Sequence, residues 1–358
     1  MMIDRDDLIV IAGAGGFIGG HLAANLRAEG FKRLRAVDRK PVSEWLQRFD
    51  DLDNQVLDLR ELPACRSAVQ DAKWIYNLAS DMGGMGFIEL NKAACMLSVL
   101  INTHLLVAAR EAGAERFFFA SSACVYNADK QRDPKVTALK EEDAYPALPE
   151  DGYGWEKLFG ERMCRHFRED YRLQTRMVRY HNVYGPHGTY AGGREKAPAA
   201  ICRKVIEAKL SGRHEIEIWG DGHQTRSFMY IDDCIHGSRM VMAGDFVDPI
   251  NVGSNELVSI NQLVDIVEGI AGIRLERRYN LSAPKGVNGR NSDNTLLKRV
   301  FGWEPSIRLR DGLTSTYQWI YDQVVAKTAL RSAGGVNISG PHLPGESLSF
   351  IQGGKYCA

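Results

Sequence analysis

The chain has 358 residues, of which 44% are hydrophobic and 25% charged, and its 45 basic side chains balance 45 acidic ones. This is the composition of an ordinary globular protein, and a formal net charge of zero argues against nucleic acid as a partner. We identify no apolar run long enough to cross a bilayer, so we expect no membrane association. The length predicts one large domain or two lobes.

The amino terminus and the cysteines both indicate a reducing compartment. The opening "MMIDRDDLIVIAG" has acidic residues where a signal peptide needs basic ones, so we expect a cytoplasmic protein that begins with a strand. The cysteines are odd in number, scattered and never spaced as CxxC, which predicts neither a disulfide framework nor a metal site. They are Cys65, Cys95, Cys124, Cys164, Cys202, Cys234 and Cys357.

The first half of the chain alternates short β-branched runs with amphipathic stretches, which is the pattern of a parallel sheet covered by helices. Strands are predicted at residues 8–13, 34–39, 55–59, 74–79, 116–123 and 175–185. Helical patterns lie near residues 17–29, 62–70, 88–112 and 152–170. This order predicts a doubly wound α/β (Rossmann) fold, in which ligands bind at the carboxyl ends of the strands.

The alternation ends near Gly185, and a helical stretch, a short strand "EIEIWG" and interleaved loops follow. We therefore assign residues 1–185 to a dinucleotide-binding domain, to which some later segments return. Residues 186–330 are assigned to a smaller C-terminal α/β lobe that binds the substrate. Residues 331–358 are rich in Gly, Ser and Pro, which predicts a loop-rich tail.

A glycine pattern follows the first predicted strand. "GAGGFIGG" has the form GxxGxxG and opens a helix, so backbone N–H groups can approach a pyrophosphate. An ordinary glycine-rich turn would look similar, but an aspartate ends the second strand about 20 residues later, where a carboxylate binds ribose hydroxyls. The cofactor site is assigned to Gly13, Gly16, Phe17, Ile18, Gly19, Asp38 and Asp58, with Tyr153 and Lys157.

The acidic residues bear on which dinucleotide binds. Asp38 repels a 2′-phosphate and so favours NAD over NADP, although the adjacent Arg39 and Lys40 could accommodate that phosphate. Asp58 ends the third strand and is placed to contact the adenine, and a solvated aspartate at a strand end is the competing interpretation. The expected cofactor is NAD.

The stretch "YGWEK" places Tyr153 and Lys157 four residues apart, on one face of a predicted helix. A packed tyrosine beside a snorkelling lysine has the same spacing, but Ser122 stands about 30 residues upstream at a strand end. A phenol with a pKa of about 10 is a poor base, so a neighbouring ammonium and a cationic nicotinamide are needed to stabilise the phenolate. Ser122 would hold the reacting oxygen.

These motifs, with "NLAS", "SSACVY" and "HNVYGP", resemble the extended short-chain dehydrogenases/reductases that act on nucleotide sugars. More narrowly, the chain is similar to the GDP-mannose 3,5-epimerase family up to about residue 325. The motifs that carry this similarity are "DMGGMGF", "SSACVY", "GGREKAPAA", "WGDGHQTRSF" and "GRNSDN". The resemblance implies an NAD-dependent isomerase that oxidises C4 of GDP-D-mannose, epimerises C3 and C5 and reduces C4 again, giving GDP-L-galactose, GDP-L-gulose or both.

The resemblance also maps an acid/base pair onto Cys124 and Lys196. Proton exchange at carbon suits a thiol with a pKa of about 8.5 and a lysine lowered by its surroundings, whereas a small buried cysteine and a solvated lysine are the structural alternatives. The family's substrate contacts map onto Gly83, Ser122, Cys124, Asn182, Glu195, Lys196, Lys204, Gln224, Arg226 and Arg290. A homodimer that pairs the helices near 88–112 and 152–170 is a further implication.

Three other functions compete with this one. A nucleotide-sugar 4-epimerase needs no second acid/base pair, and a 4,6-dehydratase typically carries an acidic residue near the position of Ser122, so Cys124 and Lys196 argue against both. A non-catalytic NAD-sensing protein would show a broken Ser/Tyr/Lys set, and here the set is complete. His187 in "GPHGTY" and the "VYN" sequence depart from the family pattern and leave the main product open.

Overall fold

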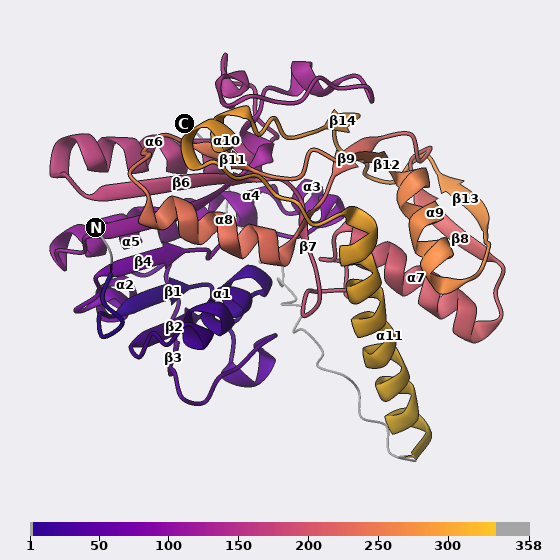
Figure 1. The fold of residues 1–358 in the computed structure, drawn as a ribbon, viewed down its shortest axis with the longest axis horizontal. Helices are drawn as coiled ribbons and strands as arrows, with labels where there is room; N and C mark the ends of the chain where they lie inside the picture. Colours follow the sequence, from indigo (N-terminus) through magenta and orange to yellow (C-terminus); the bar gives the residue numbers. More distant parts are fainter. Residues whose placement is uncertain (1–2, 334–358) are drawn as a thin grey trace, which may run out of the picture. The chain divides into compact units, whose positions relative to one another are not determined.

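The computed structural model describes residues 3–333, and the chain up to Ile320 forms one compact unit (Figure 1). Its centre is a seven-stranded parallel sheet with the strand order β11-β6-β5-β4-β1-β2-β3, as expected for a doubly wound fold. The strands are β1 (Ile9–Ala12), β2 (Leu34–Asp38), β3 (Asp53–Val56), β4 (Trp74–Asn77), β5 (Arg116–Ser122), β6 (Gln174–Tyr180) and β11 (Ile250–Val252).

Helices cover both faces of this sheet. Successive strand residues point to opposite faces, so Ile9 and Ile11 of β1 pack with α1 (Phe17–Ala28) and α8 (Ile231–Ala243), while Val10 joins the core on the other face. The second core includes residues of α2 (Leu62–Val69), α5 (Ser98–Glu111) and α6 (Tyr153–Tyr171). Each β1 side chain is fully buried, which explains its unbroken apolar sequence.

Two predicted elements are divided in the structure. The helix expected at 88–112 consists of α3 (Met85–Leu90), α4 (Lys92–Met96) and α5, because Asn91 leaves the helical conformation. The strand expected at 175–185 splits into β6 and β7 (Val183–Tyr184) at Asn182, whose φ is +44°. The third strand covers residues 53–56 instead of 55–59.

The expectation that no segment could span a bilayer was wrong by the criteria of length and composition. The stretch Lys92–Glu111 is 20 residues long with a hydropathy of 1.5 and passes that test. A core helix of a soluble protein passes it too, and α5 packs against α2 and α6. The apolar side chains of this stretch therefore need another surface to cover them, and their composition alone does not indicate a membrane.

The second half of the described chain forms three small sheets, in the orders β10-β7, β12-β9-β14 and β13-β8. Their strands are β8 (Glu215–Trp219), β9 (Thr225–Ser227), β10 (Met229–Tyr230), β12 (Leu257–Ser259), β13 (Glu276–Asn280) and β14 (Gly289–Arg290). The helices here are α7 (Ala197–Ser211), α9 (Ile260–Ala271), α10 (Thr295–Phe301) and α11 (Leu309–Ala333), and short 3-10 turns are η1 (Val42–Glu44), η2 (Ala123–Val125), η3 (Ala128–Gln131) and η4 (Glu141–Ala144).

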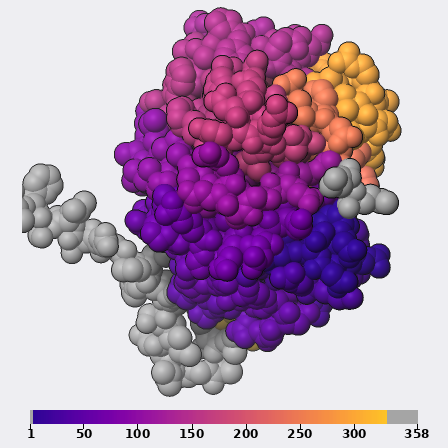
Figure 2. Space-filling model, turned by 90° about the vertical axis from the view of Figure 1, so that its left-hand side faces the viewer, coloured from indigo at the N-terminus to yellow at the C-terminus, as the bar shows by residue number. Residues whose placement is uncertain are grey.

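The proposed division at residue 185 stays a prediction. Figure 2 shows the early part of the chain, indigo to purple, on one side of this face and the magenta and orange segments on the other. The chain returns to the main sheet at β11, a three-residue strand that the sequence patterns did not reveal. In the expected tail, residues up to Ala333 belong to α11, and residues 334–358 lie outside the described part of the chain.

Candidate active site

The glycine loop after β1 forms a cradle that side chains would fill. Gly13 has a φ of +85°, and a Cβ there would lie 2.8 Å from the backbone nitrogen of Ala79. A Cβ on Gly19 would collide with the carbonyl oxygen of Gly13, while Gly16 precedes α1 without a capping side chain. The N–H groups of Phe17 and Ile18 in the first turn have no acceptor within their helix. The loop therefore fits a pyrophosphate.

We predict that Gly13→Ala lowers the affinity for NAD by more than about tenfold, because the added Cβ pushes the loop away from Ala79. Titration of the cofactor by calorimetry measures the effect. Gly113→Ala is the matched control, since Gly113 also has a positive φ but a Cβ there meets nothing within 4 Å. Both variants carry a backbone penalty of about 1–2 kcal/mol, so equal losses of NAD affinity would contradict the prediction.

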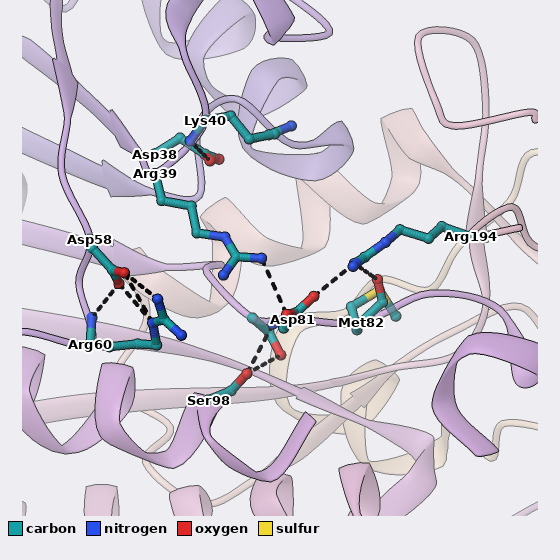
Figure 3. Close-up of polar contacts among 10 residues, drawn as sticks. Asp38, Arg39, Lys40, Asp58, Arg60, Asp81, Met82, Ser98 and Arg194 are labelled. Carbon is teal, nitrogen blue, oxygen red and sulfur yellow. Dashed lines mark hydrogen bonds and ion pairs between the residues drawn. The ribbon is translucent and has the colours of Figure 1, made fainter. Parts of the chain in front are cut away.

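The charged residues at the ends of β2 and β3 are held by local contacts, as Figure 3 shows. Asp38 accepts a hydrogen bond from the backbone N–H of Lys40 at 3.0 Å, and the Lys40 Nζ donates to the Gly15 carbonyl at 2.6 Å. Asp58 accepts from the guanidinium of Arg60, whose Nε lies 3.0 Å from both carboxylate oxygens, and this pairing lowers the pKa of Asp58. Adenine contact by Asp58 stays a prediction, and it would have to share this carboxylate with Arg60.

An ion-pair bridge connects the end of β2 to the "GGREKAP" loop (Figure 3). Asp81 lies 3.2 Å from the Arg39 Nη2 and 2.7 Å from the Arg194 Nη1. Its backbone N–H donates to the Ser98 hydroxyl at 2.9 Å, and Arg194 also donates to the Met82 carbonyl at 3.3 Å. The bridge joins a residue beside the predicted ribose site to the loop that carries Lys196.

The "MGGMG" loop lies directly against the Lys196 loop. The backbone N–H of Gly84 donates to the Arg194 carbonyl at 3.0 Å, and a Cβ on Gly84 would collide with the Glu195 carbonyl. Gly83, the predicted substrate contact, is packed against Phe87. Glu195 accepts from the Gly193 N–H at 2.7 Å and from Arg203 at 3.2 Å, so its carboxylate fixes the shape of the loop.

The structure brings the predicted serine, cysteine and tyrosine together. Ser122 ends β5, and its hydroxyl accepts a hydrogen bond from the backbone N–H of Cys124 in η2 at 3.2 Å. Tyr153 is the first residue of α6, and a Cβ on the next residue, Gly154, would collide with the Cys124 carbonyl. Cys124 and Tyr153 are buried in one apolar cluster with Ile88 and Cys95. The glycine thus lets the start of α6 lie against the turn that carries the thiol.

Lys157 lies one helical turn beyond Tyr153, as its spacing predicts. Its Nζ is 5.4 Å from the centre of the Tyr153 ring, 4.9 Å from that of Phe119, and 3.4 Å from the Glu156 carboxylate. Burial raises the pKa of Tyr153 well above its usual value, and Cys124 and Glu156 add to this rise, whereas a hydrogen bond with Ser122 opposes it. The tyrosine is therefore a neutral phenol in the free protein, and a cationic nicotinamide would favour its ionisation.

Burial shifts the pKa values of the two groups in the predicted acid/base pair in opposite directions. Burial raises the pKa of Cys124 to about 11, with Glu150 adding to the rise and Arg290 opposing it. Burial lowers the pKa of Lys196, the residue before α7, and the Cys124 sulfur opposes this change. A neutral thiol and an amine with a lowered pKa can exchange protons with carbon near neutral pH.

Arg290 lies at the thiol. It donates from Nη1 to the Cys124 sulfur at 3.4 Å, from Nη2 to the Glu150 carboxylate at 3.3 Å and from Nε to Gln131 at 2.7 Å. Arg226 lies opposite Arg290 on the neighbouring strand, and burial and Arg290 lower its pKa to about 10. Sequence reasoning did not identify Glu150 or Gln131, and the only signal for Glu150 was its place just before the "YGWEK" motif.

The remaining predicted substrate residues have local partners in the second half of the described chain. Asn182 donates to the Ser227 carbonyl at 3.0 Å, and Lys204 donates to the Glu217 carbonyl at 2.8 Å. Gln224 donates to the Trp219 carbonyl at 2.8 Å, while its side-chain oxygen is buried without a partner among the described residues. Their contacts with a nucleotide stay predictions.

A glycine cradle at the end of β1 and a Ser/Tyr/Lys set at β5 and α6 define a dinucleotide-dependent enzyme of the extended short-chain dehydrogenase/reductase class. The sequence model of the NAD dependent epimerase/dehydratase family matches residues 9–253, and the chain belongs to this family. Within it, the chain is a member of the GDP-mannose 3,5-epimerase family. GDP-mannose 3,5-epimerase 1 of Oryza sativa subsp. indica is 44% identical over 317 residues, covering 88% of this chain and 82% of the relative.

A further relative agrees with this placement, and two solved structures share the fold. GDP-mannose 3,5-epimerase of Arabidopsis thaliana is 43% identical over 322 residues, covering 90% of this chain and 84% of the relative. Among solved structures, UDP-glucose 4-epimerase of Thermotoga maritima shares the fold, with a TM-score of 0.79, 23% identity and coverage of 88% of this chain and 99% of that one. MoeE5, solved with UDP-glucose and NAD, has a TM-score of 0.74 and 29% identity, covering 89% and 99% of the two chains.

Proposed function

We propose that this protein epimerises GDP-D-mannose at C3 and C5 through a transient 4-keto sugar, giving GDP-L-galactose, GDP-L-gulose or both. The observation that carries the proposal is the buried cysteine beside a complete redox set: Cys124 shares one apolar cluster with Tyr153. A 4-epimerase requires only the redox set. A thiol at this position, with Lys196 close enough to respond to its charge, supports chemistry at the neighbouring carbons.

The residues divide the reaction between two steps. Tyr153 removes the proton of the C4 hydroxyl, Ser122 binds the same oxygen, and the Lys157 ammonium stabilises the phenolate. The glycine cradle would hold NAD, which would supply hydride acceptance from C4 and hydride return to C4. A ketone at C4 acidifies the hydrogens on C3 and C5. Cys124 and Lys196 can then remove a proton from one face of each carbon and deliver one to the other.

One incubation tests this function. GDP-mannose is converted in deuterated water, and the recovered sugars are analysed by NMR for deuterium at each carbon. Deuterium at C3 and C5, or at C5 alone for the 5-epimer, is expected. Conversion without deuterium would indicate a 4-epimerase. A 6-deoxy-4-keto product formed by loss of water, with the C4 hydrogen transferred to C6 and solvent deuterium at C5, would indicate a 4,6-dehydratase. A failure to convert any nucleotide sugar, with NAD still bound, would favour a NAD-sensing protein.

We also propose that the protein works in the cytoplasm. All six cysteines within the described residues are free, and each is buried. A protein that folds in an oxidising compartment commonly pairs its cysteines, so these free thiols support a reducing environment. A catalytic thiol at Cys124 has the same requirement, because oxidation would remove the proton that it exchanges.

A homodimer is proposed from an apolar surface on α3, α4, α5 and α6. Its exposed members are Leu90, Met96, Leu97, Leu100, Trp155 and Phe159, and Leu90 is 80% exposed. α4 packs against α6, so these side chains come from adjacent elements. Exposed apolar groups on adjacent helices are typical of interfaces, and a second copy of the chain would cover the apolar stretch Lys92–Glu111.

The double variant Leu97→Glu and Phe159→Glu is expected to be a monomer, because it places four buried carboxylates in the proposed interface. Light scattering coupled to size-exclusion chromatography measures the mass of each species. Val56→Glu is the control, since Val56 is 49% exposed and lies on β3, the edge strand of the main sheet, outside these helices. A monomeric wild type, or a double variant with unchanged mass, would contradict the proposed dimer.

A further inference from the structure

Glu150 is a carboxylate that the proposed reaction does not use. It lies in the segment before α6, and its backbone N–H donates to the Cys124 carbonyl at 2.9 Å. Its side chain is only 14% exposed, and the side-chain groups that donate to its carboxylate are the Arg290 guanidinium and the Cys124 thiol. A buried carboxylate is costly unless such groups stabilise it.

Arg290 connects this carboxylate to the thiol. One guanidinium nitrogen lies 3.3 Å from the Glu150 Oε2 and another lies 3.4 Å from the Cys124 sulfur. The third nitrogen is held by Gln131 at 2.7 Å. Gly289 fixes the strand beneath, because a Cβ there would collide with the Asp133 carbonyl. The guanidinium therefore holds carboxylate and sulfur in one fixed arrangement.

The charges around the sulfur oppose one another. Glu150 disfavours a thiolate and Arg290 favours it, after the larger effect of burial. The other ionisable groups that respond to the sulfur's charge are Tyr153, Lys196 and Arg226. Arg290 also holds the pKa of Glu150 below its usual value against the opposing effect of burial, so the carboxylate is ionised. Like charges on neighbouring buried groups resist simultaneous ionisation.

We propose that Glu150 is a positioning residue for Cys124: it holds the sulfur against Arg290 and controls how readily the thiol loses its proton. The catalytic role of Glu150 in this inference rests on the proposed function. In the free enzyme the sulfur keeps its proton at neutral pH. When the thiol gives that proton to carbon, the resulting thiolate is compensated by Arg290, and the next proton taken from carbon restores the thiol.

The test is a pH titration of Cys124 in the wild type and in the Glu150→Gln variant, measured by thiolate absorbance. The same titration of a protein that also carries Cys124→Ser is subtracted in each case, which removes the signal of the other cysteines. The midpoint is expected to fall by at least about one pH unit, because a like charge leaves a poorly solvated site. The pH dependence of deuterium exchange should move in the same direction. Asp151→Asn is the matched control, since Asp151 is 71% exposed and pairs with Lys92.

A folded Glu150→Gln protein with an unchanged midpoint would overturn the proposal, as would an equal shift in Asp151→Asn. Glu150→Asp keeps the charge, and its midpoint is expected to stay within about half a unit of the wild type. If Glu150→Gln does not fold, a Glu150→Asp midpoint as low as that of a thiol in water would overturn the proposal instead. The titration uses no substrate, so it remains decisive even if GDP-mannose is not converted.

Discussion

Replacing Cys124 with serine is expected to abolish the entry of solvent deuterium at C3 and C5 while NAD remains bound. A serine hydroxyl is a much weaker acid than a thiol, and burial raises the cost of ionising either group. General acid/base catalysis contributes about 10²- to 10⁴-fold, and the loss of exchange should lie in that range. The measurement is the rate of deuterium uptake, with bound NAD quantified in the same sample.

Cys95→Ser provides the control for this variant. Cys95 is fully buried in the same apolar cluster as Cys124, so both substitutions place a buried hydroxyl in that cluster. Only the loss of Cys124 should stop exchange, whereas the loss of Cys95 should act through stability. Undiminished exchange in Cys124→Ser would remove Cys124 from the acid/base pair.

Tyr153→Phe is expected to reduce conversion by about 10²- to 10⁴-fold and to suppress deuterium uptake equally. The phenol is the group placed to take the C4 proton, and no proton at C3 or C5 is acidic until C4 is a ketone. Both activities should therefore fall together, measured as product formed and deuterium incorporated. In Cys124→Ser, by contrast, oxidation at C4 should persist, and reduced cofactor should be detectable after GDP-mannose is added.

Tyr145→Phe is the control for Tyr153→Phe. Tyr145 is half exposed and precedes the same helix, so its hydroxyl can be removed without touching the buried cluster. Its activity should equal that of the wild type. Deuterium uptake at the wild-type rate in Tyr153→Phe would show that another group oxidises C4.

Most of the fold could be predicted because its signals are local. Strands β1 to β6 lie at or near the short runs that predicted them, although β3 has the polar sequence DNQV and begins two residues before its run. The motifs of the GDP-mannose 3,5-epimerase family are each a continuous stretch of sequence. β11 was missed because three residues carry no periodicity, and its place beside β6 is decided by tertiary contacts. The break at Asn91 was missed because the apolar pattern continues through it, although the backbone there turns away from the helix.

The candidate site could also be predicted only where its signals are local in sequence. Ser122, Cys124 and Tyr153 lie at strand and helix ends that their motifs indicate, so their proximity was predictable. Arg290 was expected to contact the substrate, and its contact with Glu150 spans 140 positions of sequence. A carboxylate just before a helix is ordinarily explained by the helix dipole. Only the folded chain places it at the sulfur.

The position of β11 bears on how substrate preference can change during evolution. Asn251 of this strand accepts a hydrogen bond from the Tyr126 hydroxyl and donates to the carbonyls of Leu139 and Asp293. Asn251 thus joins segments of the predicted dinucleotide-binding domain to a segment of the predicted second lobe at the edge of the sheet. Recombination at a point between residues 185 and 250 would replace β11 by a strand that evolved in another protein. If that strand did not pair with β6, the edge of β6 would be left without hydrogen-bond partners. New specificities in this lineage are expected to arise by point substitution in the loops, and not by exchange of whole lobes.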